Sequence, residues 1–294
     1  MEAVAEKQDV KESYRMDRKT AAGFVLLAAC FGYLYHHVIA RLVHDWIIDD
    51  NYSHGFLIVP IALYFVWERR QKLKEAGRGS SYWGFAVVLG SMAVLLAGML
   101  GSELFLTRVS MLGTIAGIIL YLFGWNYLKI LALPIAFLLL MIPIPTILFN
   151  QIAFPLQLLA SRVGETALLL AGVPVLREGN VIHLASTSLE VAEACSGIRS
   201  LISLLTLGIV YGYFTDSRVW VRVVLALGTI PIAIAANGIR VAGTGIAAHY
   251  YGAQAAEGFF HSFSGWIIFV AAFILMFILY RILCLLAPKR RLEI

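Results

Sequence analysis

The stretch Glu193-Ala-Cys-Ser-Gly-Ile-Arg199 stands at the start of an apolar run that continues to Phe214. Two further apolar runs, residues 219–245 and 263–286, follow it along the chain. Runs of about twenty apolar residues are typical of helices that cross a lipid bilayer. Arg240 lies near the end of the second run and His261 just before the third. A thiol, a cation and an imidazole therefore stand at the ends of three predicted spans.

The whole chain has the composition of a membrane protein. Of its 294 residues, 60% are hydrophobic and only 14% are charged, whereas about a quarter of the residues of a soluble domain are charged. The net charge of +5 does not indicate a nucleic-acid partner, because the Lys and Arg residues are spread over short segments between apolar runs. The composition thus excludes a soluble domain.

Eight apolar runs are candidates for membrane-spanning helices. They cover residues 21–40, 55–67, 83–101, 106–123, 126–142, 198–214, 219–245 and 263–286. We predict an all-α polytopic membrane protein with about eight transmembrane helices, give or take one or two. The second run is short, and residues 144–171 could form a ninth helix or one that lies in the interface. The chain is then a single transmembrane domain over residues 21–288, between a cytoplasmic segment at 1–20 and a cytoplasmic tail at 289–294.

Basic residues predict how these spans are oriented. They gather at residues 7–19, 69–78, 129, 218–222 and 289–291. The positive-inside rule assigns such segments to the cytoplasm, and an alternating path of eight spans places all five of them there. Both termini are expected in the cytoplasm. Cys195, Arg240 and His261 are expected at the extracytoplasmic boundary.

The long extracytoplasmic segment, residues 143–194, is predicted to form a small structure of its own. Four prolines interrupt it, which is typical of loops and turns. Residues 173–184 resemble two short strands around Glu178-Gly-Asn180. We expect a small hairpin or cap before the sixth span, which could bind an extended substrate by strand pairing.

Cys195 is the strongest candidate for a nucleophile. Three cysteines do not form a disulfide framework, and Cys30 and Cys284 fall inside apolar runs, where a cysteine is usually a small core residue. Cys195 has Ser196 beside it and Arg199 on the same helix face four residues later. A nearby cation favours the reactive thiolate over the thiol.

The two arginines at the ends of spans are candidates for function. Arginine within a span costs about 2.5–3.5 kcal/mol on insertion scales, so its default interpretation is functional or internally paired. Arg240 lies among small residues, with Asn237 on nearly the same helix face. Arg199 could be a second catalytic cation or a counter-ion for a nearby glutamate. Either arginine could instead extend to the interface.

His261 is the candidate base, because it opens a predicted helix beside two serines that could orient its ring. It could also simply cap the helix. A metal site is conceivable in one place, at His44, Asp45, Asp49, Asp50 and His54, but this spacing matches no standard site. We therefore expect neither a metal nor a cofactor.

Three short motifs, Ala194-Cys-Ser-Gly-Ile-Arg199, Asn237-Gly-Ile-Arg240 and Phe260-His261-Ser262, resemble those of the exosortase and archaeosortase family. Asp50-Asn-Tyr-Ser-His-Gly55 resembles the N-terminal signature of that family. The resemblance extends from about residue 20 to the last predicted span. Each motif is weak alone, but their order, spacing and predicted sidedness together are specific.

The resemblance implies a catalytic set of Cys195, Arg240 and His261 in a bacterial inner membrane. Arg199, Asn237 and Ser196 would support this set or bind substrate. The implied substrates are exported proteins that end in a Pro-Glu-Pro motif, a membrane helix and a basic tail. Cleavage would be followed by release, or by transfer to an amine or lipid-linked acceptor.

An enzyme of this kind would attack the substrate carbonyl through the Cys195 thiolate, with His261 as the proton carrier and Arg240 at the oxyanion. The alternative is a non-enzymatic transporter or assembly subunit for exported polysaccharide, in which Arg199 and Arg240 would line an anionic path. Such a protein would not need Cys195. Substitution of this cysteine therefore distinguishes the two hypotheses.

Overall fold

The computed structural model describes residues 18–49, 51–77, 79–185, 187–191, 198–252 and 259–286, with the backbone alone at residues 198, 259–265 and 268. The chain divides into two compact units. The first comprises Met1–Ile47 and Ala62–Ile142, and the second comprises Ile48–Ile61 and Pro143–Ile294. Each unit is described by itself below.

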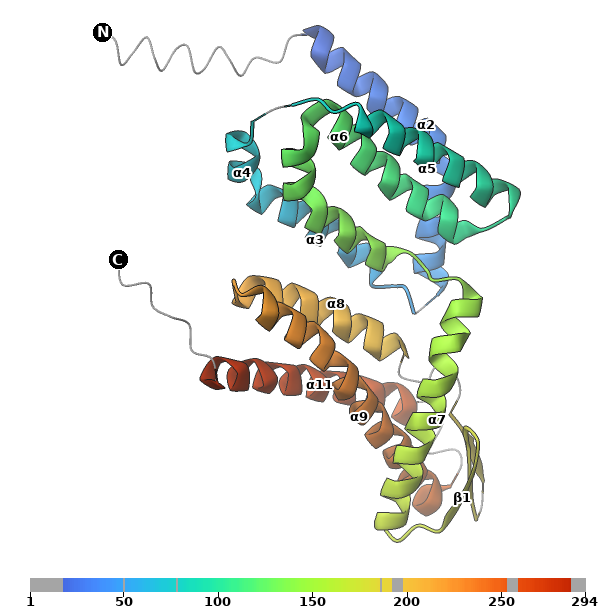
Figure 1. The fold of residues 1–294 in the computed structure, drawn as a ribbon. Coiled ribbons are helices and arrows are strands. Elements are labelled where there is room, and N and C mark those ends of the chain that lie inside the picture. The colour runs from blue at the N-terminus through green and yellow to red at the C-terminus, as the bar shows by residue number, and fades with distance from the viewer. Residues whose placement is uncertain are drawn as a thin grey trace. The chain divides into compact units, whose positions relative to one another are not determined.

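Helices and the turns between them make up the described residues of the first unit (Figure 1). Its elements are α2 (Arg18–Ile48), the second half of α3 (Gly55–Glu68), α4 (Arg70–Glu75), α5 (Trp83–Leu100), α6 (Leu104–Phe137) and the 3-10 turn η1 (Leu138–Met141). The backbones of α5 and α6 come close together at glycines. A Cβ built on Gly84 would lie 2.2 Å from the backbone nitrogen of Tyr121. This pair of helices forms the centre of the unit.

Helix α6 contains a break at Gly124, which has φ 80° and ψ −174°. This backbone conformation is open to glycine and costly for other residues. Gly124 also lies against Gly79, whose carbonyl oxygen would be 2.5 Å from an added Cβ. The apolar run predicted at 106–123 is therefore the first arm of α6, and the run predicted at 126–142 comprises its second arm and η1, with Gly124 between the two runs.

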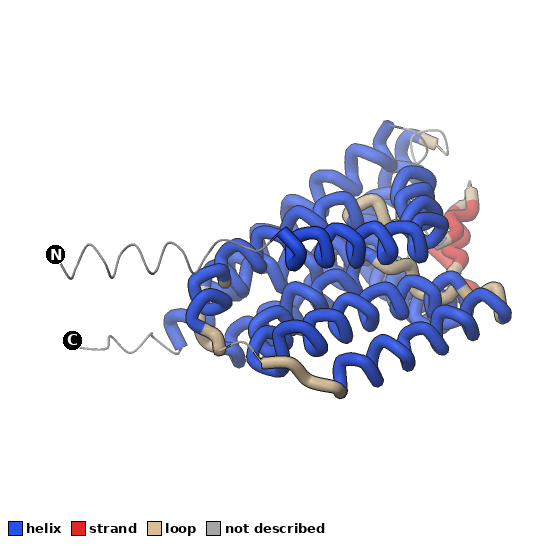
Figure 2. The backbone as a smooth tube through the Cα atoms, turned by 90° about the horizontal axis from the view of Figure 1, so that it is seen from above, coloured by secondary structure: helices blue, strands red, loops and turns tan. Residues whose placement is uncertain are grey.

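The described residues of the second unit form the first half of α3, four further helices and one small sheet. Its elements are α7 (Thr146–Leu170), β1 (Val175–Glu178), β2 (Val181–Leu184), β3 (Ser188–Glu190), α8 (Ile198–Thr215), α9 (Val219–Tyr251) and α11 (Phe259–Leu286). Figure 2 shows the strands in red beside the helices. The sheet has the order β1-β2-β3 and is antiparallel, with Glu178 opposite Val181.

The predicted hairpin is confirmed, since β1 and β2 pair around the two-residue turn Gly179-Asn180. Gly179 has φ 64°, a left-handed conformation that glycine adopts without strain. The third strand was not apparent from the sequence. Residues 146–170, the ninth possible helix, do form a helix of 25 residues, which is α7.

The sheet packs against α7 and α9. A buried cluster joins Leu168 of α7, Ile182 of β2 and Val241 and Ala248 of α9. The buried hydroxyl of Ser161 donates a hydrogen bond of 2.9 Å to the carbonyl oxygen of Gly179 in the turn. The hairpin is thus fixed to the part of α9 that follows Arg240.

An all-α membrane protein fits the structure, but the predicted number of eight spans is not confirmed. Five helical segments of the described residues are long and apolar enough to cross a membrane. They are Arg18–Ile48, Trp83–Leu100, Leu104–Met141, Val219–Tyr251 and Phe269–Leu286. The difference has physical causes. The two arms of α6 count once, and α3 has only 14 residues.

Candidate functional site

The candidate site lies in the second unit, where α8, α9 and α11 pack together (Figure 1). Small residues allow the close approach. A Cβ on Gly208 of α8 would lie 2.6 Å from the Cγ2 of Thr229 in α9, and one on Gly228 of α9 would lie 2.4 Å from the Cδ2 of Leu279 in α11. A side chain at either glycine would force the neighbouring helices apart, so the two glycines set the distance between the helices.

A small cavity lies among the three helices near the start of α8. Its lining includes Ser200 of α8, Asn237 and Arg240 of α9, and Phe269 of α11. Its volume is about 10 Å³, close to the space that one water molecule requires. The structure thus brings two of the predicted residues, Asn237 and Arg240, to the place where all three helices meet.

Burial differs between these two residues. Asn237 is only 3% exposed, whereas Arg240 is partly exposed. On the opposite face of α9, Gly238 packs against α7, where an added Cβ would lie 2.3 Å from the Cγ1 of Val163. The segment that carries Arg240 is therefore held between neighbouring helices, as the small residues around it had indicated.

Arg199, one residue before the cavity lining, contacts the loop that precedes α3. Its Nε donates a hydrogen bond of 3.3 Å to the Oδ1 of Asn51. The backbone nitrogen of Asn51 in turn donates to the Oδ1 of Asp49, at 2.8 Å. Asn51 was not singled out from the sequence as a partner of Arg199. Its place in the motif at residues 50–55 was the only available signal.

The same loop is fixed to the rest of the second unit at Tyr52. This side chain is 4% exposed, and its hydroxyl accepts a hydrogen bond of 3.1 Å from the backbone nitrogen of Ile144. The motif at residues 50–55 and the motif that begins at residue 194 are thus neighbours through Asn51 and Arg199, although they are far apart in sequence.

Cys195 and Ser196 lie outside the described residues. His261 belongs to α11, and the structure describes its backbone alone. Within the chain, Cys195 precedes Ser200 by five residues, so full extension limits the separation of their Cα atoms to about 18 Å. His261 precedes Phe269 by eight residues in one helix, a rise of about 12 Å.

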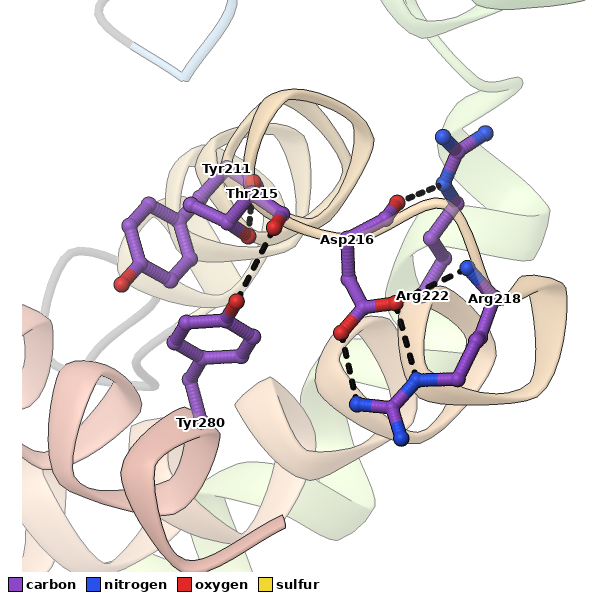
Figure 3. Close-up of polar contacts among 6 residues, drawn as sticks. All are labelled: Tyr211, Thr215, Asp216, Arg218, Arg222 and Tyr280. Atoms are coloured by element: carbon purple, nitrogen blue, oxygen red, sulfur yellow. Dashed lines mark hydrogen bonds and ion pairs between the residues drawn. The ribbon is translucent and has the colours of Figure 1, made fainter. Parts of the chain in front are cut away.

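A polar cluster lies where α8 ends and α9 begins, away from the small cavity, and Figure 3 shows it. The side chain of Asp216 is fully buried, and its Oδ2 lies 2.7 Å from an Nη of Arg218. Arg222 donates from Nε to the backbone oxygen of Asp216, at 2.6 Å, and the hydroxyl of Tyr280 in α11 donates to the backbone oxygen of Thr215, at 2.9 Å. The hydrogen bond to the Asp216 carboxylate raises the pKa of the Arg218 guanidinium above its normal value. This cluster ties the three helices together away from the cavity.

Among the described residues no group of three or more His, Cys, Asp and Glu side chains could hold a metal ion. Asp50, one of the five residues of the conceivable metal site, lies outside the described residues. Two of the carboxylates already have other partners. Asp45 pairs with Arg108, and Asp49 accepts the backbone hydrogen bond of Asn51.

Comparison with known families identifies the chain. The family model described as transmembrane exosortase matches residues 46–278. The chain belongs to the transmembrane exosortase family. The matched range spans the positions of all four motifs, from the loop before α3 to His261. No match was found among curated proteins or among solved structures. The family assignment supports a membrane-embedded sorting transpeptidase in general terms.

Proposed function

We propose that this exosortase is a cysteine protease or transpeptidase that cleaves C-terminal sorting signals of exported proteins. The signal would consist of a Pro-Glu-Pro motif, a membrane helix and a basic tail. The observation that carries the proposal is the cavity shared by Ser200, Arg240 and Phe269. Arg240 belongs to α9 itself and His261 is the third residue of α11, while Cys195 precedes the first residue of α8 by three positions in the sequence.

In the first step, the Sγ of the Cys195 thiolate attacks the carbonyl carbon of the scissile peptide bond and forms a C–S bond. His261 holds the proton released by the thiol. When the tetrahedral intermediate collapses, the C–N bond breaks and His261 gives this proton to the leaving amine. The membrane helix and basic tail depart, and the exported protein remains as a thioester on Cys195.

In the second step, water or the amine of an acceptor attacks the thioester carbonyl. The C–S bond breaks, and the thiol is restored. Water yields a free carboxylate, whereas an amine or a lipid-linked amine yields a new amide. Arg240 stabilises the negative charge on the carbonyl oxygen in both steps, a contribution worth about 3–4 kcal/mol for one such donor in other enzymes.

Arg199 supports the site from the start of α8. It is held by Asn51, and its charge favours the thiolate of Cys195 four residues earlier. The small sheet packs on α7 and on the part of α9 that follows Arg240. It is suitably placed to guide an extended motif toward the site by strand pairing. A site at the extracytoplasmic boundary of a bacterial inner membrane suits a cleavage motif immediately outside a substrate helix.

The test is processing of a substrate with this tripartite signal, expressed together with the wild type, Cys195→Ala, Arg240→Ala or His261→Ala at matched membrane levels. The substrate should become shorter with the wild type alone, and a thioester-linked species should be trapped on Cys195, at a level that rises when the acceptor is withheld if transfer and not hydrolysis completes the cycle. Cys30→Ala is the matched control, because Cys30 is an exposed, free cysteine on α2, and it should retain full processing.

Two outcomes contradict the proposal. Normal processing by Cys195→Ala would remove the nucleophile. Tolerance of Cys195→Ser combined with loss of function in Arg240→Lys would favour the transporter or assembly subunit for exported polysaccharide.

A further inference from the structure

The first unit contains a second, larger cavity that the proposed reaction does not use. It has a volume of about 560 Å³ and lies between α2, the last turns of α5 and the first turns of α6. This volume is within the range of sites that bind small ligands. The cavity is therefore large enough for the head group of a lipid together with part of an acyl chain.

Polar contacts hold α2 in place beside this cavity. The hydroxyl of Tyr35 bonds with the hydroxyls of Ser110 and Thr114 in α6, at 3.3 and 2.8 Å. Farther along α2, the indole nitrogen of Trp46 donates to the backbone oxygen of Met141, at 2.9 Å. Tyr35 and Trp46 are both buried. These bonds fix α2 on both sides of the cavity, so the space belongs to the fold of the unit.

One end of the cavity is cationic. Arg108 is 2% exposed and lines the cavity. One of its Nη atoms pairs with Asp45, while its buried Nε has no hydrogen-bond partner within the described residues. A buried donor without an acceptor is costly. A ligand oxygen in the cavity would remove that cost.

Other charges near the cavity add to this cationic character. Arg41 and His37 also line it, and both are exposed. Asp45 balances Arg108, and Glu103 is exposed and outside the lining. Arg41 therefore leaves a net positive charge, and His37 adds to it when protonated.

Most of the remaining lining is apolar, with Ser102 and Thr107 as its polar members, and it lies at one end of three predicted membrane spans. Leu34 and Val38 come from α2, and Leu95 and Met99 from α5. Helices α2, α5 and α6 are all long and apolar enough to cross a membrane. A cavity at their common end lies where lipid head groups meet acyl chains. Cations at that level attract anionic head groups.

We propose that this cavity binds one anionic lipid with a phosphate in its head group. The phosphate lies between Arg41 and the Nε of Arg108, because charge-assisted hydrogen bonds from guanidinium groups suit phosphate oxygens. An acyl chain follows the apolar side chains of α2 and α5. The occupant is a membrane component and not a free anion, since the apolar part of the lining would otherwise face water.

The experiment uses the full chain, purified in detergent from bilayers that contain phosphatidylcholine and phosphatidylglycerol, with the retained lipid measured by native mass spectrometry. The variants are Arg41→Gln, which removes an exposed cation and leaves the buried pair intact, and Leu34→Trp, which fills the space of the acyl chain. Lys74→Gln in α4 is the matched control, because this basic residue lies outside the cavity lining.

Wild type and Lys74→Gln should retain phosphatidylglycerol. Arg41→Gln should reduce retention by about tenfold, as expected for a lost charge-assisted contact, and Leu34→Trp should reduce it because the indole occupies the space of the acyl chain. Inorganic phosphate added in excess should not displace the lipid. Equal retention in Arg41→Gln overturns the proposal, as does an equal loss in Lys74→Gln, which would indicate attraction to basic residues in general. Displacement by inorganic phosphate alone would assign the site to a free anion.

Discussion

The Nε of Arg199 donates a hydrogen bond to the Oδ1 of Asn51 across 148 residues of sequence. This bond joins the start of α8, where the cysteine motif ends, to the loop that precedes α3. A guanidinium at such a position has many rotamers, and a fixed acceptor limits them. The bond therefore holds the charge of Arg199 in one place near the start of α8.

Asn51→Ala should reduce the rate of substrate processing about threefold to tenfold without a comparable loss of thermal stability. The reason is that Arg199 loses one charge-assisted hydrogen bond, whose contact is long at 3.3 Å and only partly buried. Asn51→Asp should retain activity, since a carboxylate also accepts from the guanidinium. The measurement is processing of the tripartite substrate at matched protein levels.

A double-mutant cycle gives the stricter test of this pair. Asn51→Ala should have little further effect in an Arg199→Ala background, because the bond has already been removed. If the two losses multiply instead, the bond does not act through Arg199, and the idea that Asn51 positions this arginine is wrong.

The buried carboxylate of Asp216 should govern the stability of the helix bundle and not its chemistry. Asp216→Asn removes the charge that pairs with Arg218 inside the cluster, and loss of one partner from a buried pair is strongly destabilising. We expect the melting temperature in detergent to fall by several degrees while the activity of the folded fraction is retained.

Glu165→Gln is the control for this substitution. It breaks the partly exposed pair of Glu165 and Arg177, which is worth little in water, so its melting temperature should stay close to that of the wild type. A fall of equal size in both variants would mean that burial of Asp216 contributes nothing.

The break in α6 at Gly124 provides a test of the first unit. Gly124→Ala should lower the melting temperature and the yield of folded protein, because φ 80° with ψ −174° costs any other residue about 1–3 kcal/mol and the added Cβ meets the carbonyl oxygen of Gly79. Gly90→Ala in α5, where an added Cβ meets nothing within 4 Å, should be neutral. Normal stability of Gly124→Ala would show that α6 is continuous at this position.

The sequence predicts local features of this chain better than distant contacts. The hairpin was predictable because Glu178-Gly-Asn180 favours a tight turn, and the membrane class follows from the apolar runs. The joining of two apolar runs into the single helix α6 was not predictable, because the conformation of Gly124 depends on its contact with Gly79. The partner of Arg199 was not predictable either, since 148 residues separate the pair. The roles of Cys195, Arg240 and His261 stay predictions.

The contact between Gly238 and Val163 should control the position of Arg240. Gly238→Ala places a Cβ 2.3 Å from the Cγ1 and 2.7 Å from the Cβ of Val163, so α7 and α9 must separate. Arg240 and Asn237 flank Gly238 on α9, and a misplacement of about 1 Å in a catalytic site can lower a rate about a hundredfold. We expect strong loss of substrate processing. Gly243→Ala in the same helix meets nothing within 4 Å and should behave as the wild type.

Restoration by a second change separates this mechanism from a general loss of folding. Val163→Ala removes the methyl group that lies 2.3 Å from the new Cβ but keeps the Cβ that lies 2.7 Å from it, so the double variant Gly238→Ala with Val163→Ala should recover part of the activity lost in Gly238→Ala. Processing and melting temperature should recover together, because both depend on the same distance between α7 and α9. If the double variant is as inactive as the single one, Gly238 acts through something other than its contact with Val163.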